Sequence, residues 1–451
     1  MSRRPQLHTG PLWRAFLIFL LPLIAQNILQ SLSMTINSIV VGQMLGTQAL
    51  AAVASFMPLA FFFIAFLIGI TAGSSVLIGQ AWGGGKTEVV QRLAGTSMGV
   101  SIALGAVIGG IGAACAPQIL ALLGTPADIA GTAAAYARAA FLTMPALFGF
   151  IAAGALLRGT GDSFRPLIVQ AIATATAGAL TVLMVERLGW GVASAALSSG
   201  VAQLTGLAAL GIWLSRAGHP LAPRGLVTAS MLRPDWRLLA QILRIGLPTG
   251  MQLVVGSLSG LVILGLINSF GSQATAAYGA VSQVQNYAQF PALSIAIAAS
   301  IFGAQAIGAG KAERLGAVLR TAMMMNLALT GALVALIYLA SRPLVTLFLT
   351  DPAAVDLAQH LLHIVSWSAL MFGAGTIFSG IMRSSGTVIP PMLISMGCVL
   401  VVELPLAVFL ARRVGLEGIW WAYVASFAAL MLAQGAYYAL IWRRKRIAAL
   451  I

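Results

Sequence analysis

The stretch QAWGGGKTE at Gln80–Glu88 returns about 225 positions later as QAIGAGKAE at Gln305–Glu313. Three more pairs repeat at nearly the same offset: LPLIAQ (Leu21–Gln26) with LPTGMQ (Leu247–Gln252), GTQALAAV (Gly46–Val53) with GSQATAAY (Gly271–Tyr278), and LLRGTG (Leu156–Gly161) with IMRSSG (Ile381–Gly386). The chain is therefore built from two copies of one unit, with the motifs in the same order in each copy.

Apolar residues make up 59% of the 451 positions and charged residues only 8%. Soluble domains carry about 25% charged residues, so most of this chain must lie in a membrane. The formal net charge of +15 suggests nucleic-acid binding, but the Lys and Arg residues are scattered at the ends of apolar segments and form no dense face. We therefore expect no nucleic-acid partner and interpret the basic residues as topology signals.

Apolar segments long enough for a membrane helix, about 20 residues, occur twelve times. They lack the alternation of polar and apolar residues that is typical of membrane barrel strands. The predicted fold class is an all-α polytopic membrane protein with twelve transmembrane helices. The expected spans are 13–36, 50–78, 93–115, 134–157, 166–186, 192–214, 241–268, 277–303, 317–340, 358–382, 391–411 and 418–442.

The distribution of Lys and Arg predicts the orientation of these spans. With the N-terminus in the cytoplasm, about 20 of the 25 Lys and Arg residues fall on the cytoplasmic side. Both termini are then cytoplasmic, and we expect the chain to lie in the cell's inner membrane.

An even number of spans in each copy makes the repeat parallel, with two pseudo-symmetric six-helix bundles around a central cleft. Repeats of this kind place a substrate site between the halves near the membrane midplane. We expect an N-lobe over residues 1–214, a cytoplasmic linker over 215–240 and a C-lobe over 241–451.

The repeated motifs resemble the multidrug and toxic compound extrusion (MATE) family over nearly the whole chain. The resemblance rests on the order, spacing and duplication of the motifs, including LRGTGD at Leu157–Asp162 and GQAWGGGK at Gly79–Lys86. In the first helix it rests on Pro22, Gln26, Asn27 and Asn37, followed by VGQMLGTQALAAV at Val41–Val53.

This resemblance implies a two-lobed transporter that exports amphipathic, often cationic compounds in exchange for protons or sodium ions. The chain departs from the family in its acids. The acidic residue usual in the first helix is Asn37 here, and the acids that many relatives carry in the fifth, seventh and tenth helices are absent. We keep Asn37 as a candidate for ion coupling.

Polar residues form a stripe along the first helix. Gln26, Gln30, Ser33 and Asn37 fall at i, i+4, i+7 and i+11, which is one helix face, and Asn27 widens it. A polar stripe of this length is costly against lipid, so we expect it to line the substrate cavity. Hydrogen bonding to a neighbouring helix is the alternative.

A second set of cavity candidates lies in the C-terminal copy. Gln252 is the counterpart of Gln26, and the eighth span carries Gln283, Asn286 and Tyr287 at helical spacing. Polar and aromatic side chains together suit an amphipathic ligand, because an aromatic face attracts a cation. A purely structural face is the alternative.

Glu403 lies near the middle of the eleventh span, where an ionised carboxylate costs roughly 2.5–3.5 kcal/mol. Its neighbours at i±3 and i±4 are all apolar or small and offer it no partner. A carboxyl group sealed from water favours its neutral form and can release its proton when the cleft opens, which makes Glu403 a coupling candidate. Pro405 can bend the helix beside it. The alternative is a neutral Glu403 that bonds a neighbouring helix.

The sequence therefore favours a secondary antiporter for small organic substrates, and protons are preferred over sodium because so few acids remain. A flippase for lipid-linked precursors is the second hypothesis, although it would need basic residues in its cleft and the span centres contain no Lys or Arg. An enzyme is disfavoured, since catalysis needs converging groups and the spans hold one deep Glu and no deep His.

Asp356, His360 and His363 have spacing that could bind a metal, but we interpret them as the solvated start of a helix. No cofactor is expected apart from the coupling ion. The expected partners are small-molecule substrates and membrane lipid, with the chain acting as a monomer.

Overall fold

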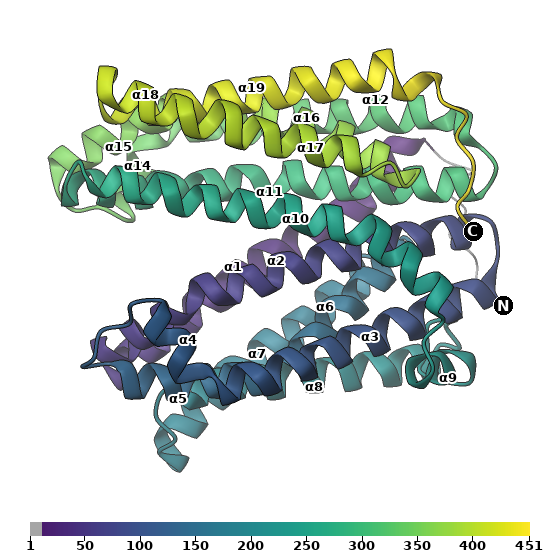
Figure 1. Cartoon of the computed structure of the whole chain (residues 1–451), viewed down its shortest axis with the longest axis horizontal. Helices are drawn as coiled ribbons and strands as arrows, with labels where there is room; N and C mark the ends of the chain where they lie inside the picture. The colour runs from purple at the N-terminus through teal and green to yellow at the C-terminus, as the bar shows by residue number, and fades with distance from the viewer. Residues whose placement is uncertain (1–10) are drawn as a thin grey trace. The chain divides into compact units, whose positions relative to one another are not determined.

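Residues 11–451 are described by a computed structural model, in which the chain forms α-helices joined by short turns (Figure 1). Residues 1–10, whose Arg3 and Arg4 enter the orientation argument, lie outside the described part. The chain divides into two units that each pack on themselves. One, the N-terminal unit, takes Ala25–Gly250, and the other, the C-terminal unit, takes residues 11–24 together with Met251–Ile451. The predicted lobes at 1–214 and 241–451 stay a prediction.

The first half of the chain carries α1 (Leu12–Leu45), α2 (Thr47–Gly83), α3 (Thr87–Ala114), α4 (Ala116–Leu122), α5 (Ala130–Leu142), α6 (Met144–Gly159), α7 (Phe164–Leu188), α8 (Ala193–Arg216), α9 (Leu226–Leu232) and α10 (Trp236–Asn268). The second half carries α11 (Ser272–Gly308), α12 (Leu315–Met325), α13 (Gly331–Leu339), α14 (Ser341–Thr346), α15 (Pro352–Val365), α16 (Ser368–Ser384), α17 (Ile389–Gly397), α18 (Leu404–Val414) and α19 (Leu416–Leu440).

Ten helices in residues 11–451 are long and apolar enough to cross a membrane, and two bent pairs bring the number to twelve. The pairs are α5 with α6, bent by 47°, and α15 with α16, bent by 42°. Pro145 stands in the first turn of α6, where it cannot continue the ladder of the preceding helix. The predicted fold class, with twelve membrane-spanning segments, is confirmed.

The repeated motifs keep glycine where the backbone turns into the left-handed region. Gly85 and its counterpart Gly310 have φ of 70° and 72°, and Gly161 and Gly386 have φ of 88° and 80°. Glycine adopts this conformation without the strain that a Cβ atom would add. The repeat in the sequence is therefore also a repeat in the geometry of the turns.

In the unit Ala25–Gly250, neighbouring helices such as α3 and α6, and α7 and α8, lie side by side. Aromatic rings from different helices meet in its core, where Phe56 contacts Phe141 edge to face with centroids 5.2 Å apart. The linker is partly helical, and α9 packs against α3 at Gly95, where an added Cβ would lie 2.3 Å from the carbonyl oxygen of Val227.

The first half of α10 approaches α2 backbone to backbone in the same unit. A Cβ atom added to Gly69 would lie 2.2 Å from Cα of Gly250, and one added to Gly73 would lie 2.4 Å from the carbonyl oxygen of Ile242. No side chain fits in this space. The contact therefore needs glycine at positions 69 and 73 of α2, whereas a Cβ atom added to Gly250 would lie 3.2 Å from the carbonyl oxygen of Phe66.

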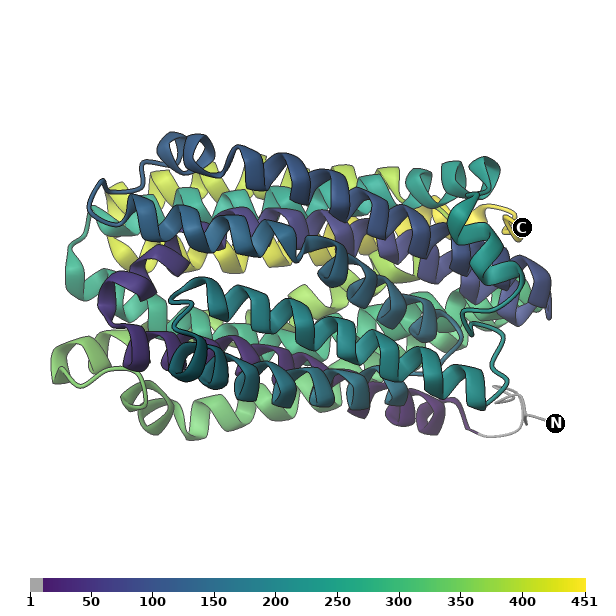
Figure 2. The ribbon, with the colours of Figure 1, turned by 90° about the horizontal axis from the view of Figure 1, so that it is seen from below.

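In the other unit, α11 lies beside α16, and α16 lies beside α19; the long helices run lengthwise along one another (Figures 1 and 2). The start of α1 packs here, with the rings of Phe16 and Phe19 at 4.7 and 5.4 Å from that of Phe302. Two spans of this unit contain a π-helix, Asn326–Thr330 and Cys398–Glu403. Such widened turns are frequent at functional sites.

Candidate functional site

Glu403 is buried within the C-terminal unit, with 5% of its surface exposed. The Ser259 hydroxyl of α10 donates a 2.6 Å hydrogen bond to its Oε1 atom. Ser426 of α19 lies near the carboxyl group and also interacts with it. Three separate spans therefore meet at one carboxyl group, and the partners that its own helix lacks come from the two neighbouring helices.

The backbone at Glu403 is a π-helix that runs from Cys398 to Glu403 and ends where α18 begins. Pro405 has no N–H to donate to the preceding turn, and its ring crowds that turn. The wider π turn accommodates both effects. The sequence predicted a bend at Pro405, and the structure shows a local widening of the helix. The Ser426 hydroxyl reaches the carbonyl oxygen of Cys398 at 3.4 Å.

Two tyrosines extend the polar cluster around Glu403. Tyr423 lies one turn before Ser426 on α19 and interacts electrostatically with Glu403 and with Tyr278 of α11. The cluster therefore contains a carboxyl group, two hydroxyls of serine and two phenols. The Glu403 carboxylate can accept a proton, and the carboxyl group can release it again.

The polar stripe of the first helix lies on a poorly covered part of α1. From Asn27 to Val40 no residue is buried, whereas Gln26 is buried and its Oε1 atom has no hydrogen-bond partner in residues 11–451. Gln30 is exposed, and Ser33 and Asn37 are half-buried. Most of the polar stripe is therefore not covered by other helices of the described structure.

The candidates in the C-terminal copy divide into two kinds. Gln252 is half-buried and donates from Nε2 to Oγ of Ser395 at 2.9 Å, which is a bond between helices. On α11, Asn286 is exposed, while Gln283 and Tyr287 are half-buried. The ring of Tyr287 meets that of Phe290 edge to face, with centroids 5.6 Å apart. An aromatic and amide face is therefore open on α11.

The residues with metal-like spacing have separate partners. Asp356 forms a 2.7 Å ion pair with Arg342, and His360 lies 3.1 Å from a carboxylate oxygen of Glu417. His363 hydrogen-bonds Ser341 at 3.0 Å. In residues 11–451 no three His, Cys, Asp or Glu residues come together in a way that could hold a metal ion.

A family model matches the chain in both copies of the repeat. The MatE model covers residues 22–184 and 248–409. The chain belongs to the MATE family. It is 39% identical over 445 residues to the probable multidrug resistance protein YoeA of Bacillus subtilis, covering 97% of this chain and 96% of that protein. It is 26% identical to the probable multidrug resistance protein YpnP of the same organism, covering 95% of each.

Solved MATE structures share the fold. An outward-facing multidrug resistance MATE transporter of the MOP superfamily matches with a TM-score of 0.87 at 21% identity and 98% coverage of both chains. A point mutant of the Vibrio cholerae MATE transporter VcmN matches with a TM-score of 0.88 at 19% identity, covering 97% of this chain and 98% of that one. This MATE chain is thus a multi-pass membrane transporter of the multidrug efflux class.

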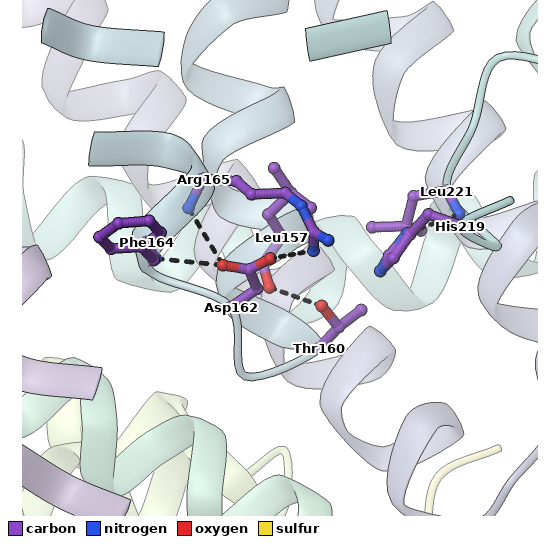
Figure 3. Close-up of polar contacts among 7 residues, drawn as sticks. All are labelled: Leu157, Thr160, Asp162, Phe164, Arg165, His219 and Leu221. Carbon is purple, nitrogen blue, oxygen red and sulfur yellow. Dashed lines mark hydrogen bonds and ion pairs between the residues drawn. The ribbon is translucent and has the colours of Figure 1, made fainter. Parts of the chain in front are cut away.

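The LRGTGD motif of this MATE chain builds a polar cluster at one end of the N-terminal unit (Figure 3). Asp162 accepts the backbone N–H groups of Phe164 and Arg165, each at 3.1 Å, and so caps α7. It also forms an ion pair with the Arg165 side chain. The Arg165 guanidinium lies over the ring of Trp213 at 5.4 Å, which joins α7 to α8.

His219 of the linker belongs to the same region. Its ring stacks on Trp82 with centroids 6.0 Å apart, and its Nδ1 atom accepts the backbone N–H of Leu221 at 3.2 Å. Burial lowers the pKa of His219 from its ordinary 6.5, the positive charge of Arg165 lowers it further, and Asp162 opposes both effects. The linker is thus held by a histidine that is favoured in its neutral form.

Sequence reasoning missed three residues of the Glu403 region, namely Ser395, Ser426 and Gln434. Each is a polar residue inside an apolar span. Their spacing along the sequence could have identified two of them. Ser395 precedes Glu403 by eight residues, and Gln434 follows Ser426 by eight residues. Two helical turns separate the members of each pair, so each pair shares one helix face.

Proposed function

We propose that this MATE transporter is a proton-coupled antiporter that exports amphipathic, cationic organic compounds. It works as a monomer in the inner membrane, with both termini in the cytoplasm as the Lys and Arg distribution indicates. Its lobes, 1–214 and 241–451, open alternately to the two sides, and its partners are small-molecule substrates and the surrounding lipid. Substrate and proton stabilise different shapes, which couples their movements.

The observation that carries the proposal is the burial of Glu403 in the middle of a span. The ten Asp and Glu residues all lie in the described residues 11–451, and among them only Glu403 is buried. A carboxyl group in this position is neutral when sealed and ionises when water reaches it. Loading and unloading of a proton therefore follow directly from opening and closing of the structure.

Protons are favoured over sodium because of the number of oxygens around Glu403. A hard metal cation is typically surrounded by about six oxygen ligands. The contacts of Glu403 described above bring one carboxyl group and the hydroxyls of Ser259 and Ser426. A proton needs only the carboxyl group, and the serine hydroxyls can donate to the carboxylate that remains.

Cationic substrates are favoured by the open face of α11. Asn286, Tyr287 and Phe290 place an amide and two aromatic rings on it. Aromatic faces attract organic cations, and the apolar parts of such compounds gain from the same surface. The open polar stripe of α1, with Gln30, is available to polar groups of the substrate.

The proposal is tested with purified transporter in liposomes that hold either a pH gradient or a sodium gradient. A fluorescent organic cation should accumulate when the pH gradient is imposed, at a rate that does not depend on sodium. Accumulation driven by sodium alone would contradict proton coupling. Failure to transport any organic cation under either gradient would contradict the substrate class.

A further inference from the structure

A second polar layer lies on the same three spans as the Glu403 cluster. The Oγ atom of Ser395, on α17, receives the Nε2 groups of Gln252 on α10, at 2.9 Å, and of Gln434 on α19, at 3.2 Å. Gln434 also donates from Nε2 to the carbonyl oxygen of Pro391 at 2.8 Å. These four residues all belong to the C-terminal unit.

The contact with Pro391 fixes the orientation of the Gln434 amide. A carbonyl oxygen can only accept, so the amide nitrogen must face it. The Oε1 atom of Gln434 consequently points elsewhere, and it is buried without a hydrogen-bond partner in the described residues, on a side chain with 0% exposure. A buried acceptor left unsatisfied costs about 1–3 kcal/mol. Such groups are normally satisfied by an internal water.

This layer lies at a definite distance from Glu403. Ser395 precedes Glu403 by eight residues, Gln434 follows Ser426 by eight, and Gln252 precedes Ser259 by seven. At 1.5 Å per residue the two layers are about 10–12 Å apart along the same helix faces. The buried side chains of Cys398 and Leu430 and the π-helix lie in this interval.

We propose that the layer formed by Gln252, Ser395 and Gln434 holds water and passes the proton of Glu403 towards the end of the span where Pro391 lies. This inference rests on the proposed function, in which that end is cytoplasmic. The carboxyl O–H bond of Glu403 breaks when the spans open and water enters the interval that Cys398 and Leu430 fill in this structure. Hydrogen-bonded water then carries the charge across that interval, and a proton leaves at the far end. Glu403 remains as a carboxylate, and no other reactant is needed.

The donor set suits water better than a metal cation. Ser395 already receives two N–H groups, which occupy both lone pairs of its hydroxyl oxygen. Its O–H remains able to donate, and Oε1 of Gln434 remains able to accept, which is the pair that a water molecule needs. The titratable groups that act on or near Glu403 are Cys398 on its own helix, Tyr423 on α19 and Tyr278 on α11.

The test uses the full chain in liposomes with a pH-sensitive dye inside, and it measures proton flux driven by a saturating organic cation. Gln434→Leu removes the free oxygen at nearly constant volume, and Ser395→Ala removes the hydroxyl. Both should lower the maximal proton flux at least roughly tenfold, with the half-saturating substrate concentration unchanged. Gln434→Glu, whose neutral carboxyl group keeps an acceptor oxygen and an O–H for the Pro391 carbonyl, should recover much of the flux.

Gln203→Leu is the matched control, because Gln203 also carries a buried Oε1 atom without a partner but lies on α8 in the other unit. It should leave the flux unchanged. If Gln434→Leu and Ser395→Ala bind substrate and move protons at the wild-type rate while Glu403→Gln does not, the water layer is refuted and the proposed function stands. If Glu403→Gln also keeps the wild-type rate, both are refuted.

Discussion

The Ser259 hydroxyl donates to Oε1 of Glu403 at 2.6 Å, across 144 positions of sequence. This bond links α10 to the π-helix of the eleventh span and gives the buried carboxyl group a donor. A hydrogen bond to a charged group contributes about 1.5–3 kcal/mol, so its removal disfavours the carboxylate that must form when the proton leaves.

Ser259→Ala should therefore slow export of an organic cation about tenfold or more, measured as the initial rate in liposomes under a fixed pH gradient. Ser259→Thr keeps the hydroxyl and should retain most of the rate. Ser257→Ala is the control on the same helix, because Ser257 is exposed and bonds only the carbonyl oxygen of Leu253. Equal rates for the two alanine variants would show that the bond to Glu403 has no part in transport.

Gly73→Ala should destabilise the N-terminal unit. The added methyl would lie 2.4 Å from the carbonyl oxygen of Ile242, which is backbone and cannot move aside without shifting α10. Overpacking of this kind costs about 1–3 kcal/mol, so the melting temperature in detergent should fall by several degrees. Gly265→Ala on α10 meets nothing within 4 Å and should leave the melting temperature unchanged or raise it. An unchanged melting temperature for Gly73→Ala would contradict the close approach of α2 and α10.

His219 gives the protein a pH-dependent stability. Its pKa is lowered from 6.5 in the folded chain, so the unfolded chain binds the proton more readily. The contribution of the neutral ring is present above about pH 6.5 and is lost as the pH falls through the lower folded value. His219→Asn keeps an acceptor for the Leu221 N–H but does not titrate.

The melting temperature of the wild type should therefore fall more steeply than that of His219→Asn between about pH 7 and pH 5. The difference between the two proteins should be small above pH 7. Parallel curves over the whole range would show that protonation of His219 has no effect on the packing of the linker against Trp82.

The sequence was sufficient to predict the number of spans and the repeat, because apolar segments and repeated motifs are local features of a sequence. Gly85 and Gly310 recur since the same turn recurs. The bends in the two broken spans were harder to predict from the sequence. Pro145 signals the break between α5 and α6, but the break at Ser366–Trp367 has no proline and depends on tertiary packing.

For the site, Glu403 was visible as the one acid deep in an apolar span, but its partners were not. Ser259 and Ser426 reach it from helices that are distant in sequence, and only the fold shows which faces meet. Gln252 illustrates the same limit. Its role in lining the cavity stays a prediction, and its bond to Ser395 was visible only in the structure.

The most direct test of the account is export of a fluorescent organic cation from cells with wild type, Glu403→Gln or Glu186→Gln at matched membrane abundance and several external pH values. Glu186 lies exposed near the end of α7 and is the control for loss of a carboxylate. Export by the wild type and by Glu186→Gln should depend on pH, and Glu403→Gln should not export. Wild-type export with the same pH dependence in Glu403→Gln would contradict it, because Glu403 would then be structural and the coupling would lie elsewhere.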